Sequence, residues 1–190
     1  MKNRVFALTM TVVVLTACSG RDSDGIACKE DYWDGVFGTC LPSDWVVIDA
    51  ETLRQRGVPQ DTIVAFQSTI PLSGQFPTVT VTREVLANVV SPQVYSEASV
   101  RAVTVLPGYE ELDTRDLRVA EEKVKLHVFK AQPTADEPLR RFYQVSTVSE
   151  GIGYSITATT PASVEADLEN QVLLILRESV FAEKAAAQKE

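Results

Sequence analysis

The chain is poor in the residues that build most metal centres, since its 190 residues include one histidine and three cysteines. Most zinc frameworks need four cysteine or histidine ligands at close spacing, and the sequence has no such group. Basic residues are also outnumbered, because 18 lysines and arginines stand against 26 aspartates and glutamates, a formal charge of −8. Nucleic-acid binding needs a basic face that neutralises phosphates, so this charge argues against a nucleic-acid partner.

The motifs of nucleophilic catalysis and phosphate binding are missing as well. The sequence has no Gly-x-Ser-x-Gly elbow, no Ser-x-x-Lys and no glycine-rich loop between a strand and a helix. The single histidine, His127, is more typical of a packed or surface residue than of a catalytic one. We therefore expect neither enzymatic activity nor a cofactor or metal. The competing hypothesis is a hydrolase or transferase that uses scattered acidic residues together with His127.

The N-terminal residues have the order of a secretory leader. Positive charge within the first four residues is followed by the apolar segment 5–15, which is too short to span a bilayer of about 30 Å as a stable helix. The sequence Leu15-Thr16-Ala17-Cys18 then resembles the lipobox of bacterial lipoproteins, in which the thiol is acylated. We expect a lipoprotein signal peptide over 1–17 and a lipid on Cys18. The alternatives are an ordinary signal peptide or a core strand that ends in cysteine.

The expected membrane attachment does not depend on surface charge. Cleavage would remove Lys2 and Arg4 but no acidic residue, so the formal charge of the mature chain falls from −8 to −10. A single acyl chain holds a protein only marginally, whereas the lipobox resemblance implies three. Residues 18–27 are polar and include glycines, which predicts a lipidated, flexible tether. We therefore expect an extracytoplasmic protein of the bacterial cell envelope, anchored to a membrane through Cys18.

Two cysteines remain once Cys18 carries lipid, and an oxidising compartment favours a disulfide between Cys28 and Cys40. A three-residue hairpin loop at Trp33-Asp34-Gly35 would place these cysteines opposite each other on paired strands. A bridge of this span stabilises a fold by about 3 kcal/mol through the unfolded state. Redox cysteines are spaced more closely, so we predict a structural disulfide that closes a small hairpin over 28–40.

Three aromatic residues of this hairpin are candidate contact residues. Tyr32, Trp33 and Phe37 could form a surface for a partner, because exposed aromatic side chains often anchor interfaces. They could equally fold back as a lid on the main domain, since large apolar side chains are usually buried. The sequence leaves both possibilities open.

Residues 41–182 predict an α+β domain. Asp49 can cap a short helix that Gly57 ends, Ser91-Pro92 begins a second helix, and Thr160-Pro161 opens a long apolar third one. Alternating or β-branched segments predict strands, and their short connections indicate antiparallel neighbours in a sheet of about six strands with helices packed on it. These strand segments are 62–67, 78–85, 112–120, 124–130, 139–148 and 154–159, after a short apolar segment at 45–48. Residues 183–190 have no pattern and are expected to be a disordered tail.

This order of elements is similar to that of the PsbP/Mog1-like domains, an α/β/α sandwich that includes bacterial envelope lipoproteins of the LpqN and DcrB type. The resemblance covers residues 41–182 and depends on Leu41-Pro42-Ser43-Asp44-Trp45, the helix from Ser91, and the junction over 153–161 with Ser179-Val180-Phe181 after it. It implies a non-catalytic role, because the family includes photosystem accessory subunits and a binder of a small nuclear GTPase. The hairpin over 28–40 lies outside the resemblance.

Together these observations predict a lipid-anchored envelope protein that binds another envelope protein or an apolar small molecule. A purely structural envelope scaffold is a further alternative. Binding predicts an apolar patch or cavity between sheet and helices, whereas an enzyme predicts His127 in a cleft within hydrogen-bond reach of a carboxylate or hydroxyl. The threonines of 78–82 and Thr157, Thr159 and Thr160 could line a polar groove, although threonine is simply common in strands.

Overall fold

The computed structural model describes residues 26–120 and 122–182. The expected signal peptide, Cys18, nearly all of the tether and the expected tail lie outside these described residues. The elements follow the order β1 (Glu30–Trp33), β2 (Phe37–Leu41), β3 (Trp45–Ile48), α1 (Ala50–Gln55), β4 (Thr62–Ser68), β5 (Thr78–Val85), α2 (Pro92–Val103), β6 (Glu110–Val119), β7 (Glu122–Ala131), β8 (Arg140–Ser149), β9 (Ile152–Pro161), α3 (Ala166–Arg177) and β10 (Val180–Phe181).

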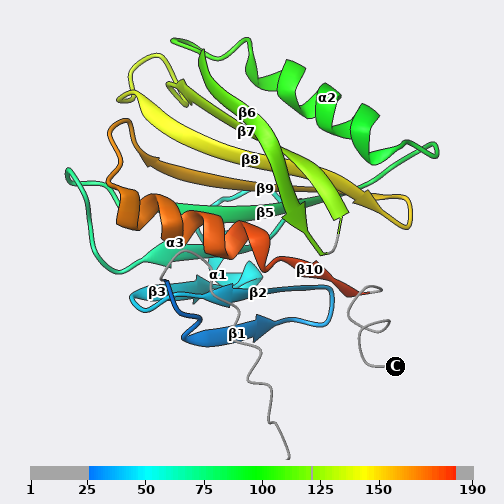
Figure 1. The fold of residues 1–190 in the computed structure, drawn as a ribbon, viewed down its shortest axis with the longest axis horizontal. Helices are drawn as coiled ribbons and strands as arrows, with labels where there is room; N and C mark the ends of the chain where they lie inside the picture. The colour runs from blue at the N-terminus through cyan, green and yellow to red at the C-terminus, as the bar shows by residue number, and fades with distance from the viewer. Residues whose placement is uncertain (1–25, 121, 183–190) are drawn as a thin grey trace, which may run out of the picture.

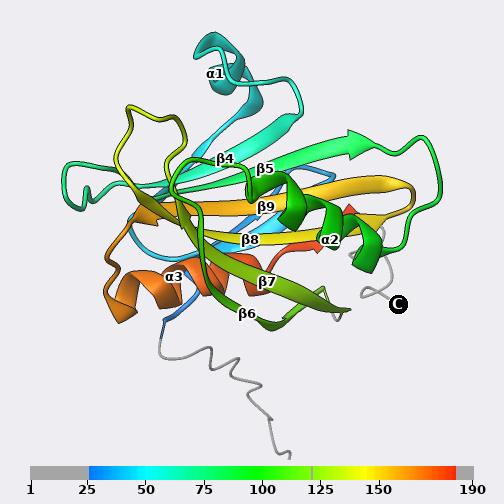
Figure 2. The same cartoon turned by 90° about the horizontal axis from the view of Figure 1, so that it is seen from above.

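The described strands form two antiparallel sheets. The larger sheet has seven strands in the order β3-β4-β5-β9-β8-β7-β6, and the smaller has the order β1-β2-β10. Helix α2 lies on one side of the larger sheet, while α3 and the smaller sheet lie on the other (Figure 1). The view from above shows α2 crossing β8 and β7 (Figure 2). The predicted α/β/α arrangement is thus confirmed, with seven strands in place of about six.

The hydrophobic core lies between the larger sheet and α3. Because side chains alternate across a strand, Tyr143 and Val145 of β8 face this core while Gln144 and Ser146 face α2. Helix α3 adds a wide apolar face with acidic residues in its first turn and Arg177 in its last, as the helix dipole favours. The six buried residues of α3 are Leu168, Val172, Leu173, Leu174, Ile175 and Leu176.

The predicted disulfide is confirmed, since the sulfur atoms of Cys28 and Cys40 are bonded and their Cα atoms lie 5.6 Å apart. The expected hairpin register is wrong, however. Cys40 pairs with Asp31, and Trp33 pairs with Gly38 instead of belonging to a three-residue loop. Cys28 therefore lies before β1 and reaches Cys40 from outside the strand pair.

The tighter turn has a local cause. The carboxylate of Asp34 accepts hydrogen bonds from the backbone amides of Val36 and Phe37, at 2.8 and 2.7 Å. An aspartate carboxylate that accepts hydrogen bonds from the amides two and three residues later stabilises a turn at its own position. Gly35 supplies the left-handed backbone that the turn requires, with φ of 94°.

The hairpin is built into the domain. All five residues of β2 are buried, and β10 pairs with the edge of β2 that β1 leaves open. Phe37 and Leu41 belong to the same core as α3. The segment that we expected to be a small hairpin with little core of its own therefore completes the layer next to α3.

Candidate functional site

The face of the larger sheet under α2 is polar. Alternate residues of three adjacent strands face this side, and cross-strand pairs such as Gln144 with Thr157 and Ser146 with Ser155 place them next to one another. Thr82 of β5 pairs with the same Ser155. The alternation that buries the apolar side chains against α3 therefore leaves a polar layer under α2, made of hydroxyls, the Gln144 amide and the Glu84 carboxylate.

Helix α2 begins at Pro92 because the residues at its N-terminus account for the backbone amides of the first turn, which have no partner within the helix. The Ser91 hydroxyl accepts a hydrogen bond from the Val94 amide, and Pro92 occupies a first-turn position where no amide hydrogen is needed. Ser96 is the one buried residue among the twelve of α2, all of which the structure describes. The helix thus packs on the sheet through Ser96 and half-buried side chains such as Tyr95 and Val100, and none of its residues belongs to the hydrophobic core.

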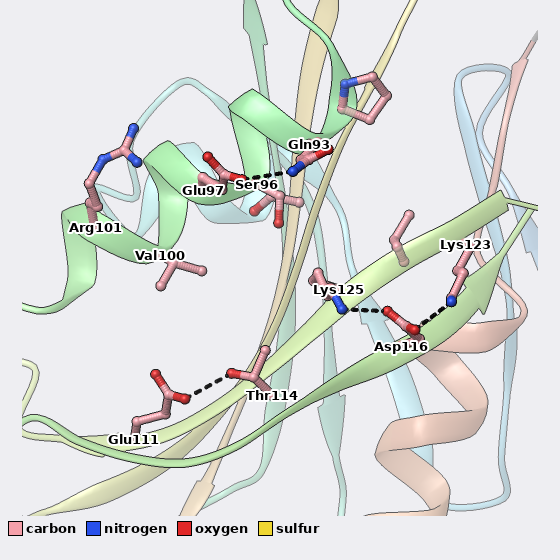
Figure 3. A pocket seen from close by; sticks show the side chains of 13 residues that line it. Gln93, Ser96, Glu97, Val100, Arg101, Glu111, Thr114, Asp116, Lys123 and Lys125 are labelled. Carbon is pink, nitrogen blue, oxygen red and sulfur yellow. Dashed lines mark hydrogen bonds and ion pairs between the residues drawn. The ribbon is translucent and has the colours of Figure 1, made fainter.

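A cavity of about 710 Å³ lies between α2 and strands β6 and β7, and we call it the α2–β6 cleft. Figure 3 shows the helix on one side of the cleft and the two strands on the other. Val100, Pro92 and Val124 provide its apolar surface. Its polar lining residues are Gln93, Ser96, Glu97, Arg101, Glu111, Thr114, Asp116, Lys123, Lys125 and Ser146.

The charges of the α2–β6 cleft are mixed and partly paired. The Asp116 carboxylate lies between two ammonium groups, 2.6 Å from Lys123 Nζ and 2.7 Å from Lys125 Nζ, and hydrogen bonds from both lysines lower the pKa of Asp116 (Figure 3). Glu97 accepts a hydrogen bond from Gln93 at 3.0 Å. Exposed ion pairs contribute little to stability, so these groups are available to a ligand at low cost.

A second cavity of about 420 Å³ lies on the other side of α2, and we call it the α2–β9 groove. Its lining carries five hydroxyl side chains together with Gln144 and Glu84. Tyr95 holds the helix here, because its ring lies directly on Gly153, where an added Cβ would come within 2.5 Å of Tyr95 Cζ. Burial, followed by the nearby Glu84 carboxylate, raises the pKa of Tyr95.

His127 is buried on the side of the larger sheet that carries α2. Its side chain is 2% exposed, its Nε2 lies 3.1 Å from the Tyr109 hydroxyl, and its ring stacks on that of Phe129 with 4.7 Å between the ring centres. The Glu111 carboxylate is 3.9 Å away. A hydroxyl is therefore within hydrogen-bond reach, as an acid/histidine enzyme would need, but His127 lines neither the cleft nor the groove that the described residues form.

The burial of His127 predicts a pH-dependent stability. Desolvation lowers the pKa of His127 below its usual 6.5, against the upward pull of Glu111. Acidification from about pH 6.5 then protonates the unfolded chain first, so stability is complete above this pH and declines below it until the folded-state pKa is reached. Urea unfolding of the wild type between pH 7.5 and 5 should show this decline. A His127→Leu chain should lose less stability over the range, and identical slopes would contradict the prediction.

The three aromatic residues of the hairpin that are candidate contact residues differ in burial. Phe37 is fully buried, and Tyr32 is half-buried with its ring edge-on to Phe66 at 5.1 Å. Trp33 is 48% exposed and is the one of the three that keeps a large free surface. Cys28 and Cys40 also lie near Asp31, but their thiols are consumed by the disulfide, so these described residues offer no thiolate to a metal.

The sequence indicated one part of this site and missed the other. Thr82 and Thr157, from the threonine-rich segments, do line the α2–β9 groove, whereas Thr160 is buried on a different part of the sheet. The pairing of Asp116 with two lysines was not predicted. Its signal was present, because the predicted strands follow each other closely in sequence, and their antiparallel pairing places Asp116 opposite Lys125.

Sequence comparison identifies no relative, since no protein-family model matches the chain and no curated protein matches it. No helix in the described residues has both the length and the apolar character needed to cross a membrane. Fold comparison is therefore the informative one.

Three solved structures share the architecture at low sequence identity. LpqN of Mycobacterium tuberculosis, described as involved in cell envelope biogenesis, has a TM-score of 0.59 and 15% identity over 76% of this chain and 82% of its own. The PsbP protein CyanoP of Synechocystis sp. PCC 6803 has a TM-score of 0.55 and 12% identity over 88% and 98%. A mutant of Mog1 has a TM-score of 0.50 and 12% identity over 80% and 95%. The chain therefore has the PsbP/Mog1-like α+β fold.

Proposed function

We propose that this protein is a non-catalytic binding module of the bacterial cell envelope, and that its α2–β6 cleft holds a segment of a partner protein. The observation that carries the proposal is the composition of the cleft. Three cationic and three carboxylate side chains surround apolar positions such as Val100 in a cavity of about 710 Å³. Concave sites that combine apolar surface with a few polar groups are the usual places where proteins bind ligands.

The same composition favours a protein segment over an apolar small molecule. An apolar molecule would remove water from charged groups such as Arg101 and Lys125 without offering them hydrogen bonds, and desolvating charged groups costs free energy. A polypeptide supplies apolar side chains, charged side chains and backbone groups together. The sealed position of His127 gives no comparable support to the acid/histidine enzyme.

The envelope location and the lipid on Cys18 belong to this proposal. They are supported by the leader, by the lipobox Leu15-Thr16-Ala17-Cys18 and by the Cys28–Cys40 disulfide, which suits an oxidising compartment. The likeness in fold to LpqN, itself described in terms of cell envelope biogenesis, points the same way.

Site-specific photo-crosslinking in intact envelopes tests the cleft. A benzophenone side chain at Lys123, which is 74% exposed at the rim, should form an adduct with one defined protein. Adding Val100→Trp, which fills the cleft, should reduce this adduct at least tenfold. The matched control is Val105→Trp, because Val105 is 83% exposed and lies just beyond α2. That change should leave the adduct unaltered.

Two results would overturn the proposal. The first is the absence of a protein adduct from Lys123 in the otherwise wild-type chain. The second is an adduct that Val100→Trp leaves unchanged while circular dichroism shows an intact fold. A small apolar molecule that co-purifies with the wild type and is lost from the Val100→Trp chain would support the alternative ligand.

A further inference from the structure

We propose that α2 opens locally as a cover while the rest of the domain stays folded, and that the polar sheet face beneath it then binds uncharged hydrogen-bonding groups such as a peptide backbone. The choice of ligand rests on the proposed function, whereas the opening of α2 does not. Four observations on α2 and its surroundings support the opening.

The first observation is how little apolar surface holds α2. Helix α3 buries six apolar side chains against the sheet, whereas α2 buries only Ser96 among its own described residues. Burial of apolar surface is the main force that holds a helix to a sheet. Helix α2 can therefore separate from the sheet without opening the core.

The second observation is the pair of cavities that flank α2. The α2–β6 cleft and the α2–β9 groove lie on opposite sides of the helix and leave it a narrow line of contact with the sheet, mainly along β8. Side chains that line these cavities face solvent instead of the sheet, so they add little to the burial that holds α2 in place. The contact between α2 and the sheet is therefore less stable than a contact without flanking cavities would be.

The third observation is a poorly bonded amide on this face of the sheet. Gln144 lies directly opposite His127 on the neighbouring strand, and its Oε1 is buried without a well-formed hydrogen bond, although its side chain interacts with the His127 ring. A buried polar atom that lacks a good hydrogen bond costs free energy, because it has lost its water. Opening would let water, or the amide groups of a ligand, reach Gln144, which lines the groove.

The fourth observation is that one side-chain contact fixes α2 to the sheet and that backbone hydrogen bonds fix the segments on both sides of the helix. Tyr95 packs on Gly153, as described above, and its ring tip contacts the sheet on the β9 side of α2. The connecting segments are tied down at Leu86, whose amide donates to the Gly151 carbonyl, and at Pro107, whose carbonyl accepts from the Gln132 amide. The short stretches between these ties and the helix are therefore the hinges.

Cysteine labelling under native conditions tests the opening. Ser146 and Thr147 are adjacent on β8 and almost equally buried, at 3% and 4% exposure, but Ser146 lines the α2–β6 cleft while Thr147 faces the opposite side beside Tyr154. In the full chain, N-ethylmaleimide should modify Ser146→Cys at least 100-fold faster than Thr147→Cys, as measured on the β8 peptide by mass spectrometry. Equal rates, both following global unfolding, would overturn the opening.

A variant of the Tyr95–Gly153 contact and hydrogen exchange of the unmodified chain provide two independent measurements of the opening. Gly153→Ala should push the Tyr95 ring aside and accelerate labelling of Ser146→Cys at least fivefold, without accelerating Thr147→Cys. In the unmodified chain, the α2 amides should exchange by a local opening that is insensitive to low urea, unlike those of β8. If the α2 amides exchange only together with β8, the opening is disproved even where a cysteine variant fails to fold.

The proposed binding of a ligand to the polar sheet face is tested by a separate measurement. Gln144→Leu removes the side-chain amide from the polar face and should reduce the photo-adduct from Lys123 at least fivefold, while labelling of Ser146→Cys stays fast. Fast labelling with an unchanged adduct would show that the polar face is not part of the binding site. The absence of any adduct in the wild type would count against the proposed function and leave the opening of α2 standing.

Discussion

Replacing Phe37 by alanine should lower the free energy of unfolding by about 3–5 kcal/mol, the range for truncating a buried phenylalanine. Phe37 is fully buried, and its ring packs between Phe66 at 6.3 Å and Phe181 at 5.9 Å. The change would leave a cavity that three separate strands line, and close-packed neighbours relax only partly around such a space. Urea unfolding followed by tryptophan fluorescence, with the disulfide intact, measures the loss.

Phe76→Ala is the matched control for this prediction. Phe76 is 48% exposed in the connection between β4 and β5, so the same chemical change there should alter stability by no more than about 0.5 kcal/mol. A loss below about 1 kcal/mol for Phe37→Ala would mean that the hairpin unfolds separately from the domain. The expected large loss would instead establish that residues 28–40 belong to one cooperative unit with α3.

Replacing Cys18 by alanine should transfer the protein from the membrane to the aqueous phase. The mature chain would begin at Cys18 and carry its acyl groups there, and each buried methylene of an acyl chain contributes about 0.8 kcal/mol to membrane binding. With a formal charge of −10 after cleavage, the protein surface offers no electrostatic attraction to an anionic bilayer. Detergent phase partitioning should place the wild type in the detergent phase and the Cys18→Ala chain in the aqueous phase.

Mass spectrometry of the purified wild type gives the decisive measurement for Cys18. The intact mass should equal that of residues 18–190 plus diacylglycerol and an amide-linked acyl group, with two thiols appearing only after reduction of Cys28–Cys40. A chain that begins at another residue and carries no lipid mass would contradict the anchor. A Cys18→Ala chain that stays in the detergent phase after its leader has been cleaved would do the same.

The type and extent of most elements followed from local pattern. Ser91-Pro92 predicted the start of α2, and the alternation of residue types over 124–130 predicted strand β7. These features depend on capping groups and on a two-residue side-chain period, which neighbours in the chain determine. The disulfide could be predicted from composition, since only Cys28 and Cys40 remain once Cys18 is assigned to the expected lipobox.

The hairpin register could not be derived in the same way. The expected three-residue loop and the observed turn at Asp34 are both reasonable for the same residues, and they differ in which residue meets Cys40. The Asp34 carboxylate favours the tighter turn, and burial of Phe37 against Phe66 and Phe181 stabilises the register that the structure has. Those two partners are distant in sequence, so no local pattern reveals them.

The sequence by itself predicted which cysteines pair and which segments are helices or strands, because cysteine number and side-chain periodicity are compositional or local properties. Only the tertiary structure decided where a ligand could bind. The α2–β6 cleft joins residues near 97, 116 and 146, which meet because β6, β7 and β8 are neighbours and α2 lies across them. That arrangement results from burying the opposite, apolar face of the sheet against α3, which leaves the polar face and its loosely packed helix as the candidate site.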